Sequence, residues 1–183
     1  MRIIDCALEA LSYLENGDII AYPTEAVYGL GCDPFNEQAV EKLLALKHRD
    51  KSKGLILLIA NDDQLRSLID IVPEDRLNAV KATWPGHVTW VFPKSQLVPS
   101  WVSGDHHTVA IRMSAHPIAQ ELCVNGPIIS TSANLSGHEP VLDIDSLYAQ
   151  FPRGIDAVLK GALGQENKPS RMYDVLSGVS FRQ

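Results

Sequence analysis

The chain has 183 residues, with 16 Lys and Arg against 22 Asp and Glu, which gives a formal net charge of −6. Hydrophobic residues make up 45% and charged residues 21% of the sequence, as in an ordinary globular protein rather than a disordered or fibrous one. The acidic balance argues against a general nucleic-acid coat protein, although an average hides where the charges lie.

The length is that of one domain, and neither a repeat nor a long linker divides the chain, so we expect a single domain over residues 1–183. The longest apolar run, residues 55–60, is far shorter than the roughly 20 residues of a membrane helix. Asp5 and Glu9 interrupt the apolar N-terminus, unlike a secretory signal. The three cysteines show no CxxC spacing and indicate a reducing compartment. We therefore expect a cytoplasmic protein that does not enter a membrane.

The first predicted element is a helix over residues 5–16, with apolar residues at helical spacing. Asp5 is predicted as its N-cap and Gly17 as its C-terminal stop. Its buried face is predicted to hold Ala7, Leu8, Leu11 and Leu14.

The following elements alternate between strands and helices, though not strictly. Apolar periodicity and β-branched content predict, in chain order, a strand at 18–22, a helix at 36–48, a strand at 55–60, helices at 62–69 and 73–83, strands at 87–92 and 108–112, a helix at 117–124, a strand at 127–131, a helix at 143–151, and strands at 155–159, 172–175 and 179–181. Because strand follows strand in two regions, the pattern indicates an α/β fold with a mixed sheet.

Several common site motifs are absent. The sequence contains no GxxxxGK[ST], HExxH or GxSxG, so a Walker-type nucleotide site, a zinc protease and a serine hydrolase are not indicated. Gly29 and Gly31 begin like a dinucleotide-binding loop, but Pro34 replaces the third glycine. Cys32 is interpreted as a buried small side chain, and the adjacent His106 and His107 as loop residues rather than metal ligands.

The first candidate site segment is PTEAVYGLG, residues 23–31, directly after a predicted strand. Loops at strand ends are where α/β proteins assemble binding sites. Thr24 offers a hydroxyl group and Tyr28 an aromatic face with a polar tip, while the two glycines allow close approach of the backbone. A simple turn is an equally good interpretation of the composition alone.

The second segment, residues 42–53, contains five basic side chains and one acid, Asp50. Lys47 and Arg49 would diverge by about 200° on an unbroken helix, so they can meet at one anion only if the helix ends between them. A lysine point charge and a planar guanidinium together suit a chain of phosphates, and a solvated helix face is the equal alternative. The basic residues are Lys42, Lys47, Arg49, Lys51 and Lys53.

The third segment is STSANLSG, residues 130–137, which follows an apolar strand. Its small hydroxyl and amide side chains, including those of Ser132 and Asn134, suit phosphate oxygens or a ribose, and an ST turn with a helix cap is the alternative. Arg112 ends another strand, where it is either a surface ion-pair residue or a clamp for a carboxylate.

The combination of PTEAVYGLG, KHR, PGHVT, AIR, STSANLSG and a terminal FR resembles the YrdC family in its short, single-domain, TsaC-type form. The resemblance extends from about Gly17 to Gln183 in the family's order. Its most specific part is the pairing of a K-x-R segment with an S-x-N segment. It implies an open, twisted, mixed parallel/antiparallel sheet (a YrdC-like fold) with a positively charged concave surface.

The resemblance also implies a function, that of an L-threonylcarbamoyladenylate synthase, a nucleotidyltransferase. Such an enzyme joins L-threonine, bicarbonate or CO2 and ATP, with Mg2+, into threonylcarbamoyl-AMP and releases diphosphate. The product serves threonylcarbamoyladenosine modification of tRNA next to the anticodon, so tRNA and the threonylcarbamoyl transferase machinery are the implied partners.

The motifs transfer residue roles to this sequence. Lys47, Arg49, Ser132 and Asn134 match the nucleotide-binding and catalytic set, with no protein metal ligand. Thr24, Tyr28 and Arg112 would hold threonine, Arg112 through the carboxylate. The late positions that close over the nucleotide are matched by Ser170 and Arg182.

Three positions depart from the pattern. Ala26 stands where many relatives have threonine, which removes a hydroxyl group from the pocket wall. His87 stands where PGP is common, and Ser170-Arg171 replaces the ST of longer relatives. None of these changes touches the K-x-R or S-x-N pairs.

Two other functions remain open from the sequence. The basic segment could hold phosphates in an RNA-binding module, for double-stranded RNA or tRNA, in ribosome or RNA maturation. The chain could also form a carbamoyl-adenylate for a different acceptor, although no acylphosphatase-like or zinc-finger segment accompanies it.

Overall fold

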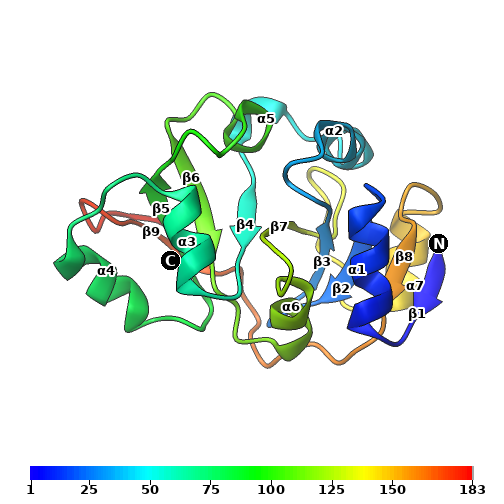
Figure 1. Ribbon diagram of the computed structural model, residues 1–183. Helices are drawn as coiled ribbons and strands as arrows, with labels where there is room; N and C mark the ends of the chain where they lie inside the picture. Colours follow the sequence, from blue (N-terminus) through cyan, green and yellow to red (C-terminus); the bar gives the residue numbers. More distant parts are fainter. Residues whose placement is uncertain (183) are drawn as a thin grey trace.

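A computed structural model describes residues 1–182, and these residues form an α/β fold around one mixed sheet (Figure 1). The strand order across the sheet is β1-β8-β2-β3-β7-β4-β6-β5-β9-β10. The strands are β1 (Arg2–Ile4), β2 (Ile20–Pro23), β3 (Tyr28–Gly31), β4 (Ile56–Leu58), β5 (Val88–Pro93), β6 (Thr108–Arg112), β7 (Ile128–Ser132), β8 (Ala157–Leu159), β9 (Arg171–Asp174) and β10 (Ser180–Arg182).

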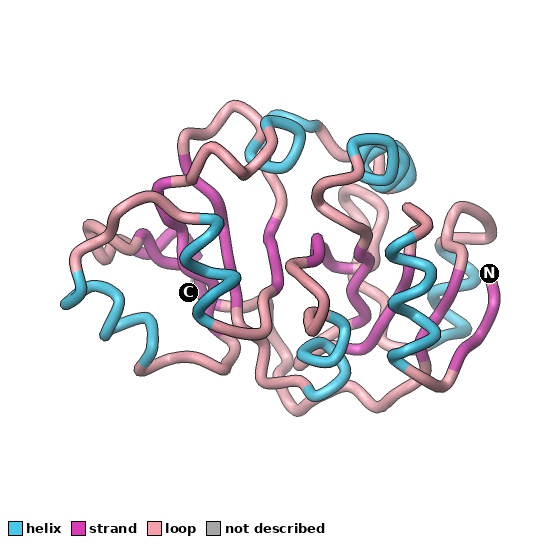
Figure 2. Tube along the Cα trace, in the orientation of Figure 1, coloured by secondary structure: helices cyan, strands magenta, loops and turns pink. Residues whose placement is uncertain are grey.

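The helices lie around this sheet, with α1, α3 and α6 in front of it in Figure 1 and α2 and α5 at its upper end. Figure 2 shows the same arrangement by element type, with the chain's N-terminus beside the β1 edge. The helices are α1 (Ala7–Glu15), α2 (Glu37–Leu46), α3 (Asp62–Leu68), α4 (Glu74–Lys81), α5 (Ser100–Ser103), α6 (Pro117–Leu122) and α7 (Ile144–Gln150), with a 3-10 turn η1 (Lys51–Lys53).

Strand β7 joins two halves of the sheet. Residues Ile128 to Ser130 pair antiparallel with β4, whereas Thr131 and Ser132 pair antiparallel with β3. The β1–β8–β2 strands are parallel to one another, β4 is parallel to β6, and β5 is parallel to β9. The sheet is therefore mixed, as the irregular alternation of elements predicts, and the polar end of β7 lies where the two halves meet.

Both faces of the central strands are buried. Successive side chains of a strand point to opposite sides of the sheet, and a hydrophobic core covers each side. On β2, Ala21 joins the core under α2, while Ile20 and Tyr22 join a second core with α1 and α6. Leu57 and Leu58 of β4 divide between the two cores in the same way. This two-sided burial explains the continuous apolar run at residues 55–60.

The first helix differs from the prediction at its start and on its buried face. Its N-cap is Cys6 rather than Asp5, with no side-chain hydrogen bond, whereas Gly17 at φ 76° ends it as expected. Leu11 and Leu14 are buried, but Leu8 is 72% exposed. Leu8 therefore lies outside the buried part of the helix surface, which contains Ala10, Leu11 and Leu14.

Four elements were not predicted: β1, β3, α5 and the short turn η1. The segment at 23–31 is a hairpin rather than a loop, because β2 and β3 pair antiparallel from Ile20–Gly31 to Pro23–Tyr28. Glycines at positions 29 and 31 hide a strand from a propensity argument, but Gly31 is needed there: an added Cβ would lie 2.6 Å from the Ile129 carbonyl oxygen. Across residues 1–182, each helix falls short of the length and apolar character that crossing a membrane would require.

Candidate active site

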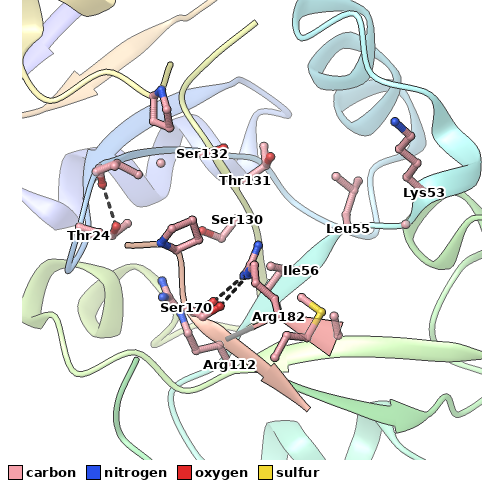
Figure 3. A pocket seen from close by; sticks show the side chains of 18 of the residues that line it. Thr24, Lys53, Leu55, Ile56, Arg112, Ser130, Thr131, Ser132, Ser170 and Arg182 are labelled. Carbon is pink, nitrogen blue, oxygen red and sulfur yellow. Dashed lines mark hydrogen bonds between the residues drawn. The ribbon is translucent and has the colours of Figure 1, made fainter. Parts of the chain in front are cut away.

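A cavity of about 910 Å³ opens where the two halves of the sheet meet (Figure 3). One wall comes from the β2–β3 hairpin with Thr24, Ala26 and Gly29. The floor contains the end of β7, and the other wall comes from β4, β6, β9 and β10. The volume lies within the range of ligand pockets and suits a nucleotide beside a smaller molecule.

Strand β6 contributes to the cavity through its alternating side chains. Thr108, Ala110 and Arg112 line the cavity, while Val109 and Ile111 between them are buried in the core. Because side chains alternate along a strand, Arg112 at the end of β6 lies on the same face as Thr108 and Ala110 and reaches the cavity. Arg112 is only 7% exposed, so it is not a surface residue, although it does form an ion pair, with Glu25.

The cavity is cationic although the chain as a whole is acidic. Glu139 is the single acidic residue in the lining, against five Lys and Arg residues. These cations are Arg49, Lys53, Arg112, Lys168 and Arg182. A concave surface with this excess of positive charge attracts anions such as phosphates and carboxylates.

Arg112 is held on both sides. Its Nη2 lies 3.3 Å from Glu25 Oε2, and its Nη1 donates a hydrogen bond of 3.1 Å to His87 Nδ1. Glu25 is itself fixed, because its Oε1 accepts hydrogen bonds from Ser114 Oγ at 2.7 Å and from the Ala115 amide at 3.0 Å. Burial raises the pKa of Glu25, but the Arg112 charge and these hydrogen bonds outweigh it and hold the pKa below its usual range. Arg112 is thus a fixed cation at the cavity wall.

Helix α2 ends as the K-x-R interpretation requires. Lys47 is its C-cap and His48 adopts φ 50°, so the backbone turns between Lys47 and Arg49. Arg49 lines the cavity and donates one hydrogen bond, from Nη2 to the Gly54 carbonyl oxygen at 2.9 Å. Its Nε is buried and has no hydrogen-bond partner among the described residues.

Lys47 lies behind the cavity surface. It is 4% exposed, and its Nζ donates to the Ser132 carbonyl oxygen and, at 2.7 Å, to the Asn134 carbonyl oxygen. Burial and the nearby Arg49 charge lower the pKa of Lys47 to about 8. Lys47 Nζ also lies 3.5 Å from Asn134 Oδ1. The structure thus joins the K-x-R and S-x-N segments through the lysine, mainly to the backbone of the second segment. Of the other basic residues in the segment, Lys53 lines the cavity, whereas Lys42 and Lys51 are exposed elsewhere.

The S-x-N segment forms a tight polar turn at the end of β7. Ser132 Oγ donates to Asn134 Oδ1 at 2.5 Å, and the Asn134 amide donates to the carbonyl oxygens of Leu135 and His138. Ser132 lines the cavity together with Ser130 and Thr131, whereas Asn134 is not part of the lining. Asn134 therefore shapes the turn that presents the hydroxyl groups.

Ser170 and Arg182, the two candidate site residues near the C-terminus, also meet at the cavity (Figure 3). Arg182 donates from Nε to the Ser170 carbonyl oxygen at 2.7 Å and from Nη2 to Ser170 Oγ at 2.9 Å. Ser170 Oγ also lies 2.8 Å from Thr89 Oγ1. Burial, and secondarily the Arg112 charge, lower the pKa of Arg182. Residues 12 positions apart in sequence thus form one contact beside Arg112.

The predicted threonine-binding residues divide into two groups. Thr24 lines the cavity, and its Oγ1 donates to the Val27 carbonyl oxygen at 2.7 Å. Tyr28 is 4% exposed, lies outside the lining and directs its hydroxyl group to the Gly161 carbonyl oxygen at 3.4 Å. The Tyr28 side chain is part of the hydrophobic core. The structure therefore brings Thr24 and Arg112 to the cavity but not Tyr28.

Two contributors to the site have weak sequence signals. Glu25 belongs to the PTEAVYGLG segment. A carboxylate next to a buried strand is expected to have a cationic partner. His87 carries no local signal, because its partners Arg112 and Lys168 are distant in sequence. Cys32 is buried as predicted, and burial raises the pKa of its thiol to about 12, which leaves it protonated at neutral pH.

Comparison with known proteins assigns a family to this fold and cavity. The Sua5/yciO/yrdC family model, described as telomere recombination, matches residues 12–182. The chain is 49% identical over 175 residues to a protein of Methylococcus capsulatus named threonylcarbamoyl-AMP synthase, and the match covers 94% of each chain.

Solved structures agree. The P. abyssi Sua5 structure complexed with L-threonine has a TM-score of 0.89 and 33% identity, covering 95% of this chain and 54% of that one. The chain thus spans about half of that longer protein. The structure of E. coli YciO has a TM-score of 0.85 at 24% identity, with 100% of this chain and 93% of that chain covered, and supports the fold. The chain belongs to the Sua5/YciO/YrdC family.

Proposed function

We propose that this protein is a threonylcarbamoyl-AMP synthase, which condenses L-threonine, bicarbonate or CO2 and ATP and releases diphosphate. The observation that carries the proposal is the fixed Arg112 guanidinium at the wall of a cationic cavity large enough for a nucleotide and an amino acid. The relatives named threonylcarbamoyl-AMP synthase support it over nearly the whole chain.

Threonine binds on the Arg112 side of the cavity. Arginine presents a planar fork of donors that matches a carboxylate, and Glu25 and His87 hold that fork in one direction. Thr24 lies on the hairpin wall of the same cavity. A zwitterionic amino acid therefore has a cation for its carboxylate and hydroxyl groups nearby for its polar atoms.

ATP binds across the end of β7. Arg49 and Arg182 offset phosphate charge, while Ser132 and Ser170 provide neutral hydrogen bonds. Lys47 and Asn134 act from behind the surface by fixing the turn that carries Ser132.

The reaction itself requires two anions to meet. The neutral amine of threonine attacks CO2 and loses a proton to solvent, which gives an N-carboxylate. One oxygen of that carboxylate then attacks the α-phosphorus of ATP. The bond from the α-phosphorus to the bridging oxygen breaks, diphosphate leaves, and AMP is transferred, so the enzyme is a nucleotidyltransferase. The protein's task is to orient the substrates and neutralise their charge, and the step requires no covalent nucleophile on the enzyme.

Mg2+ enters with ATP in this proposal. No three His, Cys, Asp or Glu side chains gather at one point in residues 1–182, and Glu139 is the one carboxylate in the cavity lining. Such a lining fits an ion whose ligands are mostly phosphate oxygens and water, the usual arrangement for nucleotide-bound Mg2+. Bound there, Mg2+ supplies further charge neutralisation on the phosphates.

The product serves tRNA modification, so the threonylcarbamoyl transferase machinery and tRNA are the proposed partners. We place the reaction in the cytoplasm. The three cysteines are all free and two are buried, which fits a reducing compartment.

Diphosphate release by the purified protein tests the proposal. It should require ATP, L-threonine and bicarbonate together, and omission of any one should abolish it. RNA binding without diphosphate release under these conditions would favour the RNA-binding function instead. Activity with carbamoyl phosphate in place of threonine and bicarbonate would favour a carbamoyl-adenylate enzyme with another acceptor.

A further inference from the structure

His87 lies between the proposed threonine site and the segment that precedes β9. Its Nδ1 is 3.1 Å from Arg112 Nη1, and its Nε2 is 2.8 Å from the Lys168 carbonyl oxygen. Lys168 belongs to a stretch, residues 167–170, that lines the cavity and ends at Ser170. One imidazole ring therefore contacts both Arg112 and the backbone of a cavity-lining segment.

The partners of His87 determine where its proton lies. A guanidinium can only donate hydrogen bonds, so Nδ1 must accept from Arg112. A carbonyl oxygen can only accept, so Nε2 must carry the hydrogen that binds Lys168. Both contacts are satisfied by one state alone, the neutral ring with its proton on Nε2.

We infer that His87 is a positioning residue, which as a neutral imidazole directs the Arg112 guanidinium toward the carboxylate of threonine. The inference rests on the proposed function, in which Arg112 binds that carboxylate. Glu25 holds Nη2 from one side and His87 holds Nη1 from the other. The guanidinium cannot turn without losing one of these contacts, and its other N–H groups stay available to substrate.

Two amide substitutions separate the contacts of His87. In His87→Asn the side-chain oxygen lies as many bonds from Cβ as Nδ1, so it can accept from Arg112. In His87→Gln the amide nitrogen reaches the position of Nε2, so it can donate to Lys168 but the Arg112 contact is lost. His107→Gln is the matched control, since His107 is exposed and lies outside the cavity lining.

Calorimetric titration with L-threonine near neutral pH measures the effect. We expect His87→Gln to weaken binding about tenfold, the loss typical of one hydrogen bond to a charged group. His87→Asn should bind like the unaltered protein, and so should His107→Gln.

The inference is overturned if His87→Gln binds threonine as tightly as the unaltered protein, or if His87→Asn binds as weakly as His87→Gln. Thermal unfolding of each variant identifies any loss of fold. No threonine binding by the unaltered protein would overturn the proposed function and this inference together. Threonine binding that is insensitive to the His87 substitutions would overturn the inference alone.

Discussion

Arg49 and Lys47 are neighbours in the K-x-R segment but have different surroundings. Arg49 reaches the cavity and contributes one hydrogen bond to the protein, whereas Lys47 supports the backbone of the S-x-N segment. The motif therefore contains one residue that lines the cavity, where we propose that the phosphates bind, and one that holds the turn. Substitutions at the two positions should therefore differ in their effect on stability.

We expect Arg49→Ala to abolish adenylate formation and to leave the free energy of unfolding almost unchanged. Lys47→Ala should abolish activity as well, but it should also lower stability by about 1–3 kcal/mol, because it leaves buried carbonyl oxygens without a donor. Diphosphate release and urea unfolding measure the two effects. Near-normal turnover in either variant would contradict the assignment, and equal stability loss in both would contradict the division of roles.

The Glu25–Arg112 ion pair is the buried charge pair of the site, with side chains only about one-tenth exposed. Because its folded pKa is lowered, Glu25 contributes stability above its unfolded pKa, and this contribution is lost as the pH falls through the folded value. Glu25→Gln should destabilise the protein near neutral pH by about 3–5 kcal/mol, since it leaves Arg112 buried and unpaired.

The loss caused by Glu25→Gln should shrink below about pH 4, where the native carboxylate itself becomes protonated. Urea unfolding at several pH values measures this. Glu9→Gln is the control, because Glu9 pairs with Arg2 at 3.1 Å on the exposed surface, where a pair contributes about 0–1 kcal/mol. A Glu25→Gln loss no larger than that of Glu9→Gln would show that the buried pair adds little.

At the scale of elements, α1 illustrates what helical spacing predicts and what it leaves open. The apolar positions predict the helix, but they do not say how wide a stripe the neighbouring α6 and β8 will cover. Leu11 lies in the covered stripe at 8% exposure and Leu8 outside it at 72%. A single face of a helix thus divides between core and solvent.

Substitution of the two leucines tests this division. Leu11→Ala should lower the free energy of unfolding by about 2–5 kcal/mol, because it leaves a cavity in the second core. Leu8→Ala should change it by no more than about 0.5 kcal/mol, as exposed positions usually do. Chemical unfolding of both variants under identical conditions gives the comparison. Similar losses at the two positions would mean that Leu8 is covered in solution.

At the scale of the whole molecule, the charge of the chain and the charge of its cavity have opposite signs. The chain has a formal charge of −6, while the cavity lining holds five Lys and Arg residues and one glutamate. The excess of acid lies elsewhere on the surface, for example in the first turns of α3 and α4. The net charge of the chain therefore bears on its solubility, whereas the charge of the cavity lining determines which ligands the cavity attracts.

Nucleotide binding should consequently weaken with salt even though the protein is acidic. Raising ionic strength from about 50 mM to about 500 mM shortens the screening length severalfold, so the affinity for a non-hydrolysable ATP analogue should fall severalfold. Threonine, a zwitterion, should lose much less. Calorimetry at both salt concentrations measures the difference. Equal salt dependence for the two ligands would argue against phosphate binding by the cavity cations.

The sequence by itself determined the α/β class, most of the elements and the K-x-R and S-x-N segments, because these depend on local periodicity and on motifs carried by neighbouring residues. It also placed the end of α2 near His48. The meeting of Lys47 and Arg49 at one anion is not what the structure shows, because Lys47 lies behind the cavity surface. It missed the β3 strand, because glycines 29 and 31 are chosen for close backbone packing rather than for strand propensity.

The tertiary structure decided which of the predicted residues reach the cavity. Arg49, Ser132, Ser170, Arg182, Thr24 and Arg112 line it, whereas Lys47, Asn134 and Tyr28 lie behind the surface. It also placed Glu25 and His87 on either side of Arg112, across 87 and 25 residues of chain respectively. The physical reason is that sheet pairing and burial, which join distant strands, fix the direction of each side chain, and no local pattern records which partner it will meet.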